Sequence, residues 1–132
     1  MKSSGILIAN RGEISVRIAR AAADLGIRSV SIYSEDDKNS LHTKISNEAA
    51  LIPGMGAKAY LDIDSIMLTA KKMGCDMLHP GYGFLSERVD FAERCEIEGI
   101  TFVGPNVEHL RLFGDKGEAR SAAIEAGVPV LK

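Results

Sequence analysis

Short apolar runs alternate along this chain with longer segments of helical periodicity, and this alternation constrains the fold more than any other feature. The runs predicted to be strands cover 5–9, 28–34, 49–53, 75–80, 100–105 and 128–132. Strands that alternate with helices at this spacing favour a parallel sheet with right-handed crossovers. The sequence therefore predicts an α/β fold: an open parallel sheet with helices on both faces.

The segments between these runs repeat apolar residues three and four positions apart, which places the apolar side chains on one face of a helix. Helices are predicted over 13–26, 61–74, 86–99, 106–114 and 115–127, with one further turn near 41–45. Ser86 and Asn106 are the predicted N-caps of two of them. Asp115 and Glu118 have the spacing of a capping box.

The composition fits one globular domain of 132 residues with a modest core. Hydrophobic residues make up 45% of the chain, charged residues 26%, and the net charge is -2. Positive and negative side chains are interspersed, and no apolar run is long enough for a membrane span or a secretory signal. We therefore expect no nucleic-acid or membrane partner. The chain stops soon after its last predicted strand starts, which indicates that residues 1–132 are a piece of a longer protein.

The chain has two cysteines, Cys75 and Cys95, and each lies in an apolar pattern. This pattern predicts two buried free thiols, and their spacing does not match a CxxC metal site. Unpaired thiols favour a reducing, cytoplasmic setting.

Four loops follow predicted strands, at the edge of the sheet where open α/β folds bind ligands. They read NRGEI, SEDDKN, HPGYGFLSE and GPN. The first loop has a single glycine, Gly12, so it lacks the G-x-G-x-x-G spacing of a dinucleotide site. It also lacks the carboxylates that a Mg²⁺-dependent phosphotransfer domain needs there. Two interpretations stay open: Asn10 caps the following helix with a tight turn at Gly12, or Arg11 or Glu13 contacts a neighbouring domain or ligand.

The loop HPGYGFLSE crowds aromatic residues between glycines. Tyr82 lies between Gly81 and Gly83, which permit backbone conformations with positive φ. An aromatic ring held on such a turn can form a wall for a flat ligand. The alternative is that Tyr82 and Phe84 fold back on the edge of the sheet, and the residues alone do not decide between the two. His79 is expected to be a hydrogen-bonded structural histidine.

Lys116 lies in the first turn of its predicted helix, where the helix dipole disfavours a cation by about 0.3–1 kcal/mol. The neighbouring Asp115 and Glu118 offset this locally in one interpretation. In the other, a phosphate docks on the ammonium group and on the backbone N–H groups of the helix start.

Four segments, ILIANRGEISVRIARAAADLGI, HPGYGFLSE, FVGP and FGDKGEAR, resemble in order and spacing the N-terminal domain of the biotin carboxylase family. That family includes the biotin-carboxylating parts of acetyl-CoA, propionyl-CoA and pyruvate carboxylases. The resemblance runs from Ile6 to about Val130. It implies a Rossmann-like pre-ATP-grasp domain. It also implies a complete enzyme that uses MgATP and bicarbonate to make carboxyphosphate and then carboxylates N1′ of biotin on a carrier protein.

The resemblance also implies roles for particular residues. Lys116 matches a lysine that contacts ATP, and Tyr82 and Gly83 match the loop that borders the biotin and bicarbonate region. Arg20 and Asp24 lie where the family makes dimer contacts. No catalytic or metal-binding residue is expected in this chain, because the family's glycine-rich lid, Mg²⁺-binding glutamates and substrate-binding arginine belong to later parts of the chain.

The resemblance implies several partners: the ATP-grasp remainder of the same chain, a biotin carboxyl carrier domain, a carboxyltransferase component and a second copy of the enzyme. Two positions depart from the family pattern, Arg88 where Asn is usual and Phe113 where Met is usual. The leading hypothesis is an N-terminal part of a biotin-dependent carboxylase that is inactive alone. The alternatives are a stand-alone mononucleotide-binding module, an interaction module that docks through Arg17 and Arg20, and the equivalent domain of another ATP-grasp ligase such as carbamoyl-phosphate synthetase.

Overall fold

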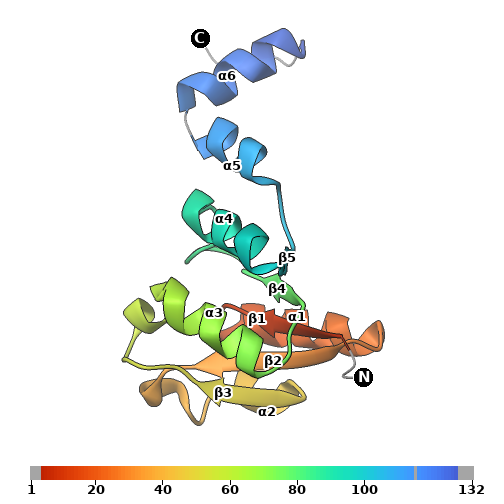
Figure 1. Cartoon of the computed structure of the whole chain (residues 1–132), viewed down its shortest axis with the longest axis vertical. Helices are drawn as coiled ribbons and strands as arrows, with labels where there is room; N and C mark the ends of the chain where they lie inside the picture. Colours follow the sequence, from red (N-terminus) through yellow and green to blue (C-terminus); the bar gives the residue numbers. More distant parts are fainter. Residues whose placement is uncertain (1–3, 115, 128–132) are drawn as a thin grey trace.

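The computed structural model describes residues 4–114 and 116–127, and a parallel sheet lies at its centre (Figure 1). The described strands are β1 (Gly5–Ile8), β2 (Arg28–Tyr33), β3 (Glu48–Leu51), β4 (Met77–His79) and β5 (Thr101–Phe102). They form one sheet in the order β3-β2-β1-β4-β5, and every pairing is parallel. Leu7 in the central strand pairs with Val30 on one side and Leu78 on the other. The predicted parallel sheet is confirmed.

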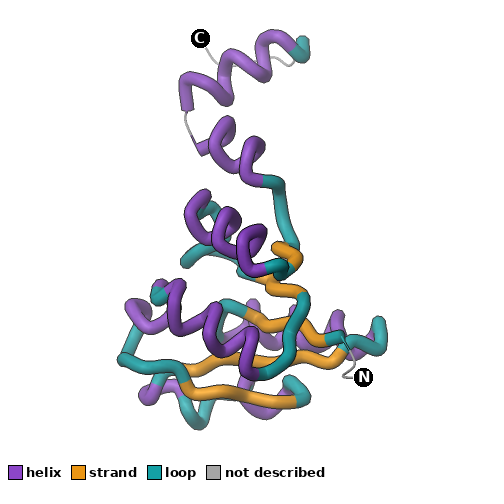
Figure 2. Tube along the Cα trace, viewed as in Figure 1, coloured by secondary structure: helices purple, strands orange, loops and turns teal. Residues whose placement is uncertain are grey.

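The helices cover both faces of this sheet, as predicted. They are α1 (Gly12–Asp24), α2 (His42–Ile45), α3 (Ile63–Lys72), α4 (Val89–Glu98), α5 (Val107–Gly114) and α6 (Lys116–Glu125), with short 3₁₀ turns η1 (Glu35–Asp37) and η2 (Ala57–Leu61). Helices α1 and α2 pack together against the strands, and α3 and α4 contact each other (Figures 1 and 2). Because the chain leaves β1 in one direction and β4 in the other, right-handed crossovers place these pairs on opposite faces.

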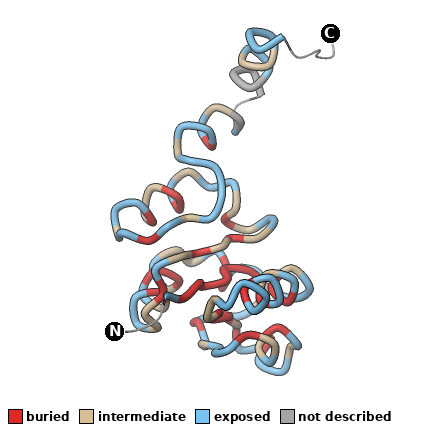
Figure 3. The backbone as a smooth tube through the Cα atoms, turned by 90° about the vertical axis from the view of Figure 1, so that its right-hand side faces the viewer, coloured by how far each residue is buried: buried red, intermediate tan, exposed pale blue. Residues whose placement is uncertain are grey.

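Burial on both faces explains the sequence of the central strands. Burial is concentrated along the sheet and the helix faces that meet it (Figure 3). All of Gly5–Ile8 is buried, which is why this strand reads as a continuous apolar run rather than an alternating one. At the other end of the sheet, the Phe91 ring of α4 meets the Phe102 ring of β5 edge-on, with centroids 6.0 Å apart. The predicted burial of Cys75 and Cys95 as free thiols is confirmed.

The helix starts agree only in part with the sequence. Asn106 is a cap as predicted, because its Oδ1 accepts the His109 N–H at 2.8 Å. The prediction for Ser86 is wrong, since α4 starts at Val89 and its N-cap is Arg88. The Ser86 N–H donates to the Gly83 carbonyl at 2.9 Å, so Ser86 belongs to a turn of the preceding loop.

The last two helices extend away from the sheet, beyond α4 (Figure 1). Asp115 and the final predicted strand, 128–132, lie outside the described residues, as does the side chain of Glu118. The predicted capping box and last strand therefore stay predictions. No helix within residues 4–114 and 116–127 has the length and apolar character needed to span a membrane.

Candidate functional site

The predicted loops gather at one edge of the sheet, because the described strands all run in the same direction. The strand order reverses between β1 and β4, so these strands form the switch point at which open α/β sheets usually bind ligands. The Ala9 N–H donates to the His79 carbonyl at 2.9 Å and extends the ladder to the ends of both strands. The loops that follow, starting at Asn10 and Pro80, therefore lie beside each other.

Asn10 fills the crevice between these two loops. Its side chain is buried, at 2% exposure, and its Nδ2 donates to the Pro80 carbonyl at 2.9 Å and to the Tyr82 carbonyl at 2.8 Å. Its Oδ1 accepts the Arg11 N–H at 2.8 Å. The interpretation that Asn10 caps the helix is wrong, because Arg11 is the N-cap of α1 and the N-cap side chain makes no capping hydrogen bond. Asn10 ties the two loops together instead.

The turn around Tyr82 depends on two glycines with left-handed backbone. Gly81 has φ 66° and Gly83 has φ 74°, a region that side chains with a Cβ rarely adopt. A Cβ at Gly81 would lie 2.7 Å from Nδ2 of Asn10, whereas a Cβ at Gly83 would meet nothing within 4 Å. Gly81 is therefore packed against the crevice, and Gly83 faces open space.

The structure separates the two aromatic residues that the sequence left together. Tyr82 is 82% exposed, while Phe84 packs on the core and places its ring centroid 5.5 Å from that of Tyr60. Phe84 has φ 45°, so it accepts left-handed strain to point inward. His79 is structural as predicted, because its Nδ1 accepts the Gly81 N–H at 3.0 Å and burial lowers its pKa.

Arg11 is engaged in an ion pair inside the chain. Its Nη2 lies 2.8 Å from Oδ1 of Asp37, and its guanidinium carbon lies 5.4 Å from the centroid of the Tyr60 ring. The Tyr60 hydroxyl donates to Oδ2 of Asp37 at 2.7 Å and accepts the Ser34 N–H at 3.1 Å. Burial, reinforced by this carboxylate, raises the pKa of Tyr60 to about 12. The network fixes the loop after β2 against the loop after β1.

His42 fixes the start of α1. It is 1% exposed; its Nδ1 accepts the Gly12 N–H at 3.3 Å, and its Nε2 contacts the Ile32 carbonyl at 3.0 Å. A carbonyl can only accept, so the proton is on Nε2 and the imidazole is neutral. Burial lowers the pKa of His42, which agrees with this state. The tight turn predicted at Gly12 is present, with φ 61°.

The remaining predicted site residues lie apart from this edge. Lys116 is the first residue of α6, which stands off from the sheet, and its side chain is outside the described part of the structure (Figure 1). Arg20 and Asp24 are exposed on α1, one turn apart. The structure therefore brings Asn10, Tyr82 and Gly83 together, and α6, which begins at Lys116, lies apart from them.

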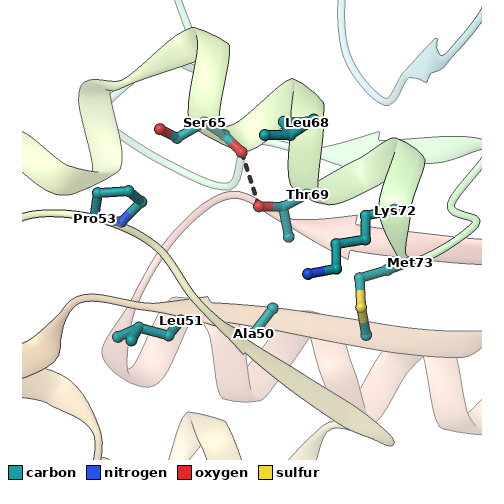
Figure 4. A pocket seen from close by; sticks show the side chains of 8 residues that line it. All are labelled: Ala50, Leu51, Pro53, Ser65, Leu68, Thr69, Lys72 and Met73. Carbon is teal, nitrogen blue, oxygen red and sulfur yellow. Dashed lines mark hydrogen bonds between the residues drawn. The ribbon is translucent and has the colours of Figure 1, made fainter.

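A separate groove of about 410 Å³ lies between the edge strand β3 and α3 (Figure 4). Its lining is mostly apolar and consists of Ala50, Leu51, Pro53, Ser65, Leu68, Thr69, Lys72 and Met73. Within it, the Thr69 hydroxyl donates to the Ser65 carbonyl at 2.8 Å (Figure 4). None of these residues belongs to the loops at the switch point.

Sequence reasoning missed the contacts that build the site. The role of Asn10 could have been inferred, because it is a polar residue directly after a buried strand at the centre of the sheet. The Asp37–Tyr60 contact joins residues 23 positions apart, and no local pattern indicated it. Within residues 4–114 and 116–127, no group of three His, Cys, Asp or Glu side chains could hold a metal ion.

The class of protein follows from the topology and the site: a Rossmann-like α/β domain whose switch-point loops present an exposed tyrosine on a glycine turn. A family model described as "Biotin carboxylase, N-terminal domain" matches residues 2–110. The chain belongs to this family.

The relatives are much longer proteins. The chain is 54% identical over 129 residues to the pyruvate carboxylase of Bacillus subtilis (strain 168), covering 96% of this chain and 11% of that protein. It is 49% identical over 127 residues to biotin carboxylase 1 of the same organism, covering 96% of this chain and 28% of that protein. The chain therefore spans less than a third of these relatives.

Solved structures agree with the fold. The biotin carboxylase domain of a single-chain bacterial carboxylase superposes with a TM-score of 0.94 at 49% identity, over 98% of this chain and 30% of that one. The complete multifunctional pyruvate carboxylase from Rhizobium etli superposes with a TM-score of 0.92 at 42% identity, over 100% of this chain and 13% of that one.

Proposed function

We propose that this chain is the N-terminal domain of an ATP-dependent biotin carboxylase, in which it forms one wall of the site where carrier-bound biotin is carboxylated with bicarbonate and MgATP. The observation that carries the proposal is the Tyr82 turn. In a chain of this family, an aromatic side chain that is 82% exposed stands on two left-handed glycines at the switch point of the sheet. The two positive-φ glycines hold the Tyr82 ring outward at the edge of the sheet where open α/β folds bind ligands, and an aromatic face in that place suits contact with a bound molecule.

The residues of the turn have distinct tasks in this proposal. Gly83 lets a substrate approach the backbone, because no Cβ stands in the way and the space beside it is open. The Tyr82 ring offers a flat apolar face to the fused rings of biotin. These groups bind and orient the substrate.

Lys116 is proposed to contact the phosphates of ATP. It is the first residue of α6, and the backbone N–H groups of a helix start together with a lysine are suited to bind an anion. Phosphoryl transfer depends mostly on positioning and on neutralising charge around the phosphates. The family resemblance assigns the Mg²⁺ ligands to the remainder of the enzyme.

The partners follow from the same proposal. The ATP-grasp remainder of the chain would complete the site, a biotin carboxyl carrier domain would deliver biotin, and a carboxyltransferase component would take the carboxyl group onward. Arg20 and Asp24, both exposed on α1, are proposed dimer contacts. The two free thiols fit a cytoplasmic enzyme.

The test measures bicarbonate-dependent ATP hydrolysis and carboxylation of free biotin by the full-length protein. Lys116→Ala is expected to raise the KM for ATP without changing the thermal unfolding midpoint, whereas Lys58→Ala, at an exposed lysine of η2, should change neither. The 132-residue chain alone should show no hydrolysis above the buffer background, because one lysine and one wall cannot neutralise the phosphates.

Two results would contradict the proposal. One is clear ATP hydrolysis by the isolated chain, or micromolar ATP binding by it in calorimetry, which would indicate a stand-alone nucleotide-binding module. The other is unfolding of the domain by Lys116→Ala, which would assign the lysine to helix capping rather than to ATP.

A further inference from the structure

We propose that Asn10 is a positioning residue for biotin carboxylation: it sets the orientation of the Tyr82–Gly83 peptide so that the Gly83 N–H points outward as a fixed donor for a substrate oxygen. This inference rests on the proposed function. Asn10 does not touch the substrate in this arrangement, and it acts through the backbone of the loop after β4.

The orientation of the Asn10 side chain is determined by all of its partners. Oδ1 accepts the Arg11 N–H at 2.8 Å, and the two hydrogens of Nδ2 go to the Pro80 and Tyr82 carbonyls at 2.9 and 2.8 Å. A flipped amide would place Oδ1 against two carbonyl oxygens and Nδ2 against an N–H group, so only one orientation satisfies the contacts. At 2% exposure, water cannot replace these bonds.

The Tyr82 carbonyl is held by this amide and not by packing of its side chain. The ring is 82% exposed, so it contributes little to fixing the turn. Gly81 lies directly against the amide, since a Cβ there would approach Nδ2 of Asn10 to 2.7 Å. The loop therefore follows the position of Asn10 closely.

Peptide geometry carries this orientation to Gly83. The described segments 4–114 and 116–127 contain no cis peptide bond, and in a planar trans peptide the carbonyl and the following N–H point in opposite directions. Because the Tyr82 carbonyl points inward to Asn10, the Gly83 N–H points away from the crevice. This N–H has no hydrogen-bond partner among residues 4–114 and 116–127. It is thus a directed donor beside an exposed aromatic ring, suited to a carbonyl or carboxylate oxygen.

The experiment uses the full-length protein with free biotin and ATP as the varied substrates. Asn10→Asp keeps the shape of the side chain but turns its donors into acceptors that repel both carbonyls. Asn10→Ala removes the contacts without adding charge. Each should lower kcat/KM for free biotin by about tenfold to a hundredfold, the effect of misplacing a group by about 1 Å, while the KM for ATP changes less than about twofold.

Asn47→Ala is the matched control. Oδ1 of Asn47 accepts the Ser29 N–H at 2.9 Å near the start of β2, at the opposite edge of the sheet, so this variant also loses a side-chain bond to the backbone. It should leave the constants for both substrates unchanged. A merely structural role of Asn10 would instead lower activity with biotin and with ATP alike.

The outcomes separate this inference from the proposed function. If the wild-type protein does not carboxylate biotin, the proposed function fails and this inference fails with it. If the wild-type protein is active and both Asn10 variants keep their kcat/KM for biotin, or lose activity equally for both substrates, the positioning role alone is overturned. Where Asn10→Asp does not fold, Asn10→Ala decides by the same comparison, the loss in kcat/KM for biotin against the change in the KM for ATP.

Discussion

Replacing Gly81 by alanine is expected to destabilise the protein about three times as much as replacing Gly83 by alanine, although the two backbones are similar. Their φ angles are 66° and 74°, so each alanine would suffer left-handed strain of about 1 kcal/mol. The difference arises from what a Cβ meets. At Gly83 nothing lies within 4 Å, so strain is the whole effect.

At Gly81 the added carbon would have two close neighbours. It would lie 2.7 Å from Nδ2 of Asn10 and 2.8 Å from Cγ2 of Ile14. The Asn10 amide cannot move aside without losing its bonds to the Pro80 and Tyr82 carbonyls. Overpacking of this kind costs about 2 kcal/mol, which brings the expected total for Gly81→Ala to about 3 kcal/mol.

Urea unfolding of the 132-residue chain, followed by far-ultraviolet circular dichroism, measures both variants. With an m-value of about 1.5 kcal/mol/M, the midpoint should fall by about 2 M for Gly81→Ala and by about 0.7 M for Gly83→Ala. In an Asn10→Ala background the effect of Gly81→Ala should shrink, because one of the two close contacts is gone. Equal shifts for the two alanines, or a larger shift for Gly83→Ala, would refute the packing described for this turn.

Three further predictions concern buried polar groups. Tyr60→Phe removes a hydrogen-bond donor from the Asp37 carboxylate and should lower the free energy of unfolding by about 3 kcal/mol in urea titrations. The control is Tyr33→Phe at a half-buried tyrosine, whose free energy of unfolding should stay within about 0.5 kcal/mol of the wild-type value. Ser15→Ala should leave the free energy of unfolding unchanged or raise it by about 1 kcal/mol in the same titrations, because the Ser15 hydroxyl is buried without a hydrogen-bond partner among the described residues. A clear decrease in the free energy of unfolding would contradict this. Burial lowers the pKa of His42, so the unfolded chain binds a proton at this histidine more readily than the folded chain does. The free energy of unfolding should therefore be constant above pH about 7 and fall as the pH drops below the usual histidine pKa of 6.5. A free energy of unfolding that rises on acidification would rule this out.

The fold was predictable because its signals are local. Continuous apolar runs such as Gly5–Ile8 identify buried parallel strands, and regular apolar spacing identifies the helices between them. The same signals cannot decide where a helix begins when several capping residues compete. Ser86 lies in a turn because its N–H already bonds to the Gly83 carbonyl, and α4 begins only at Val89.

The candidate site was predictable in its location but not in its contacts. Strand order makes the loops after β1 and β4 neighbours, and that order is not a property of any one segment. Whether Tyr82 or Phe84 turns inward depends on the space beside Tyr60, which the sequence does not encode locally. The family resemblance supplied the roles of Tyr82, Gly83 and Lys116, and these roles stay predictions.

The buried Asn10 side chain between the loops after β1 and β4 also affects where an inhibitor could bind. In many doubly wound folds a small molecule can be grown into the gap at the switch point, but here the Asn10 amide occupies that gap through its bonds to Pro80 and Tyr82. A compound aimed at this part of the protein would have to sit on the outer rim of the loops. Its affinity would then come mainly from the exposed face of the Tyr82 ring.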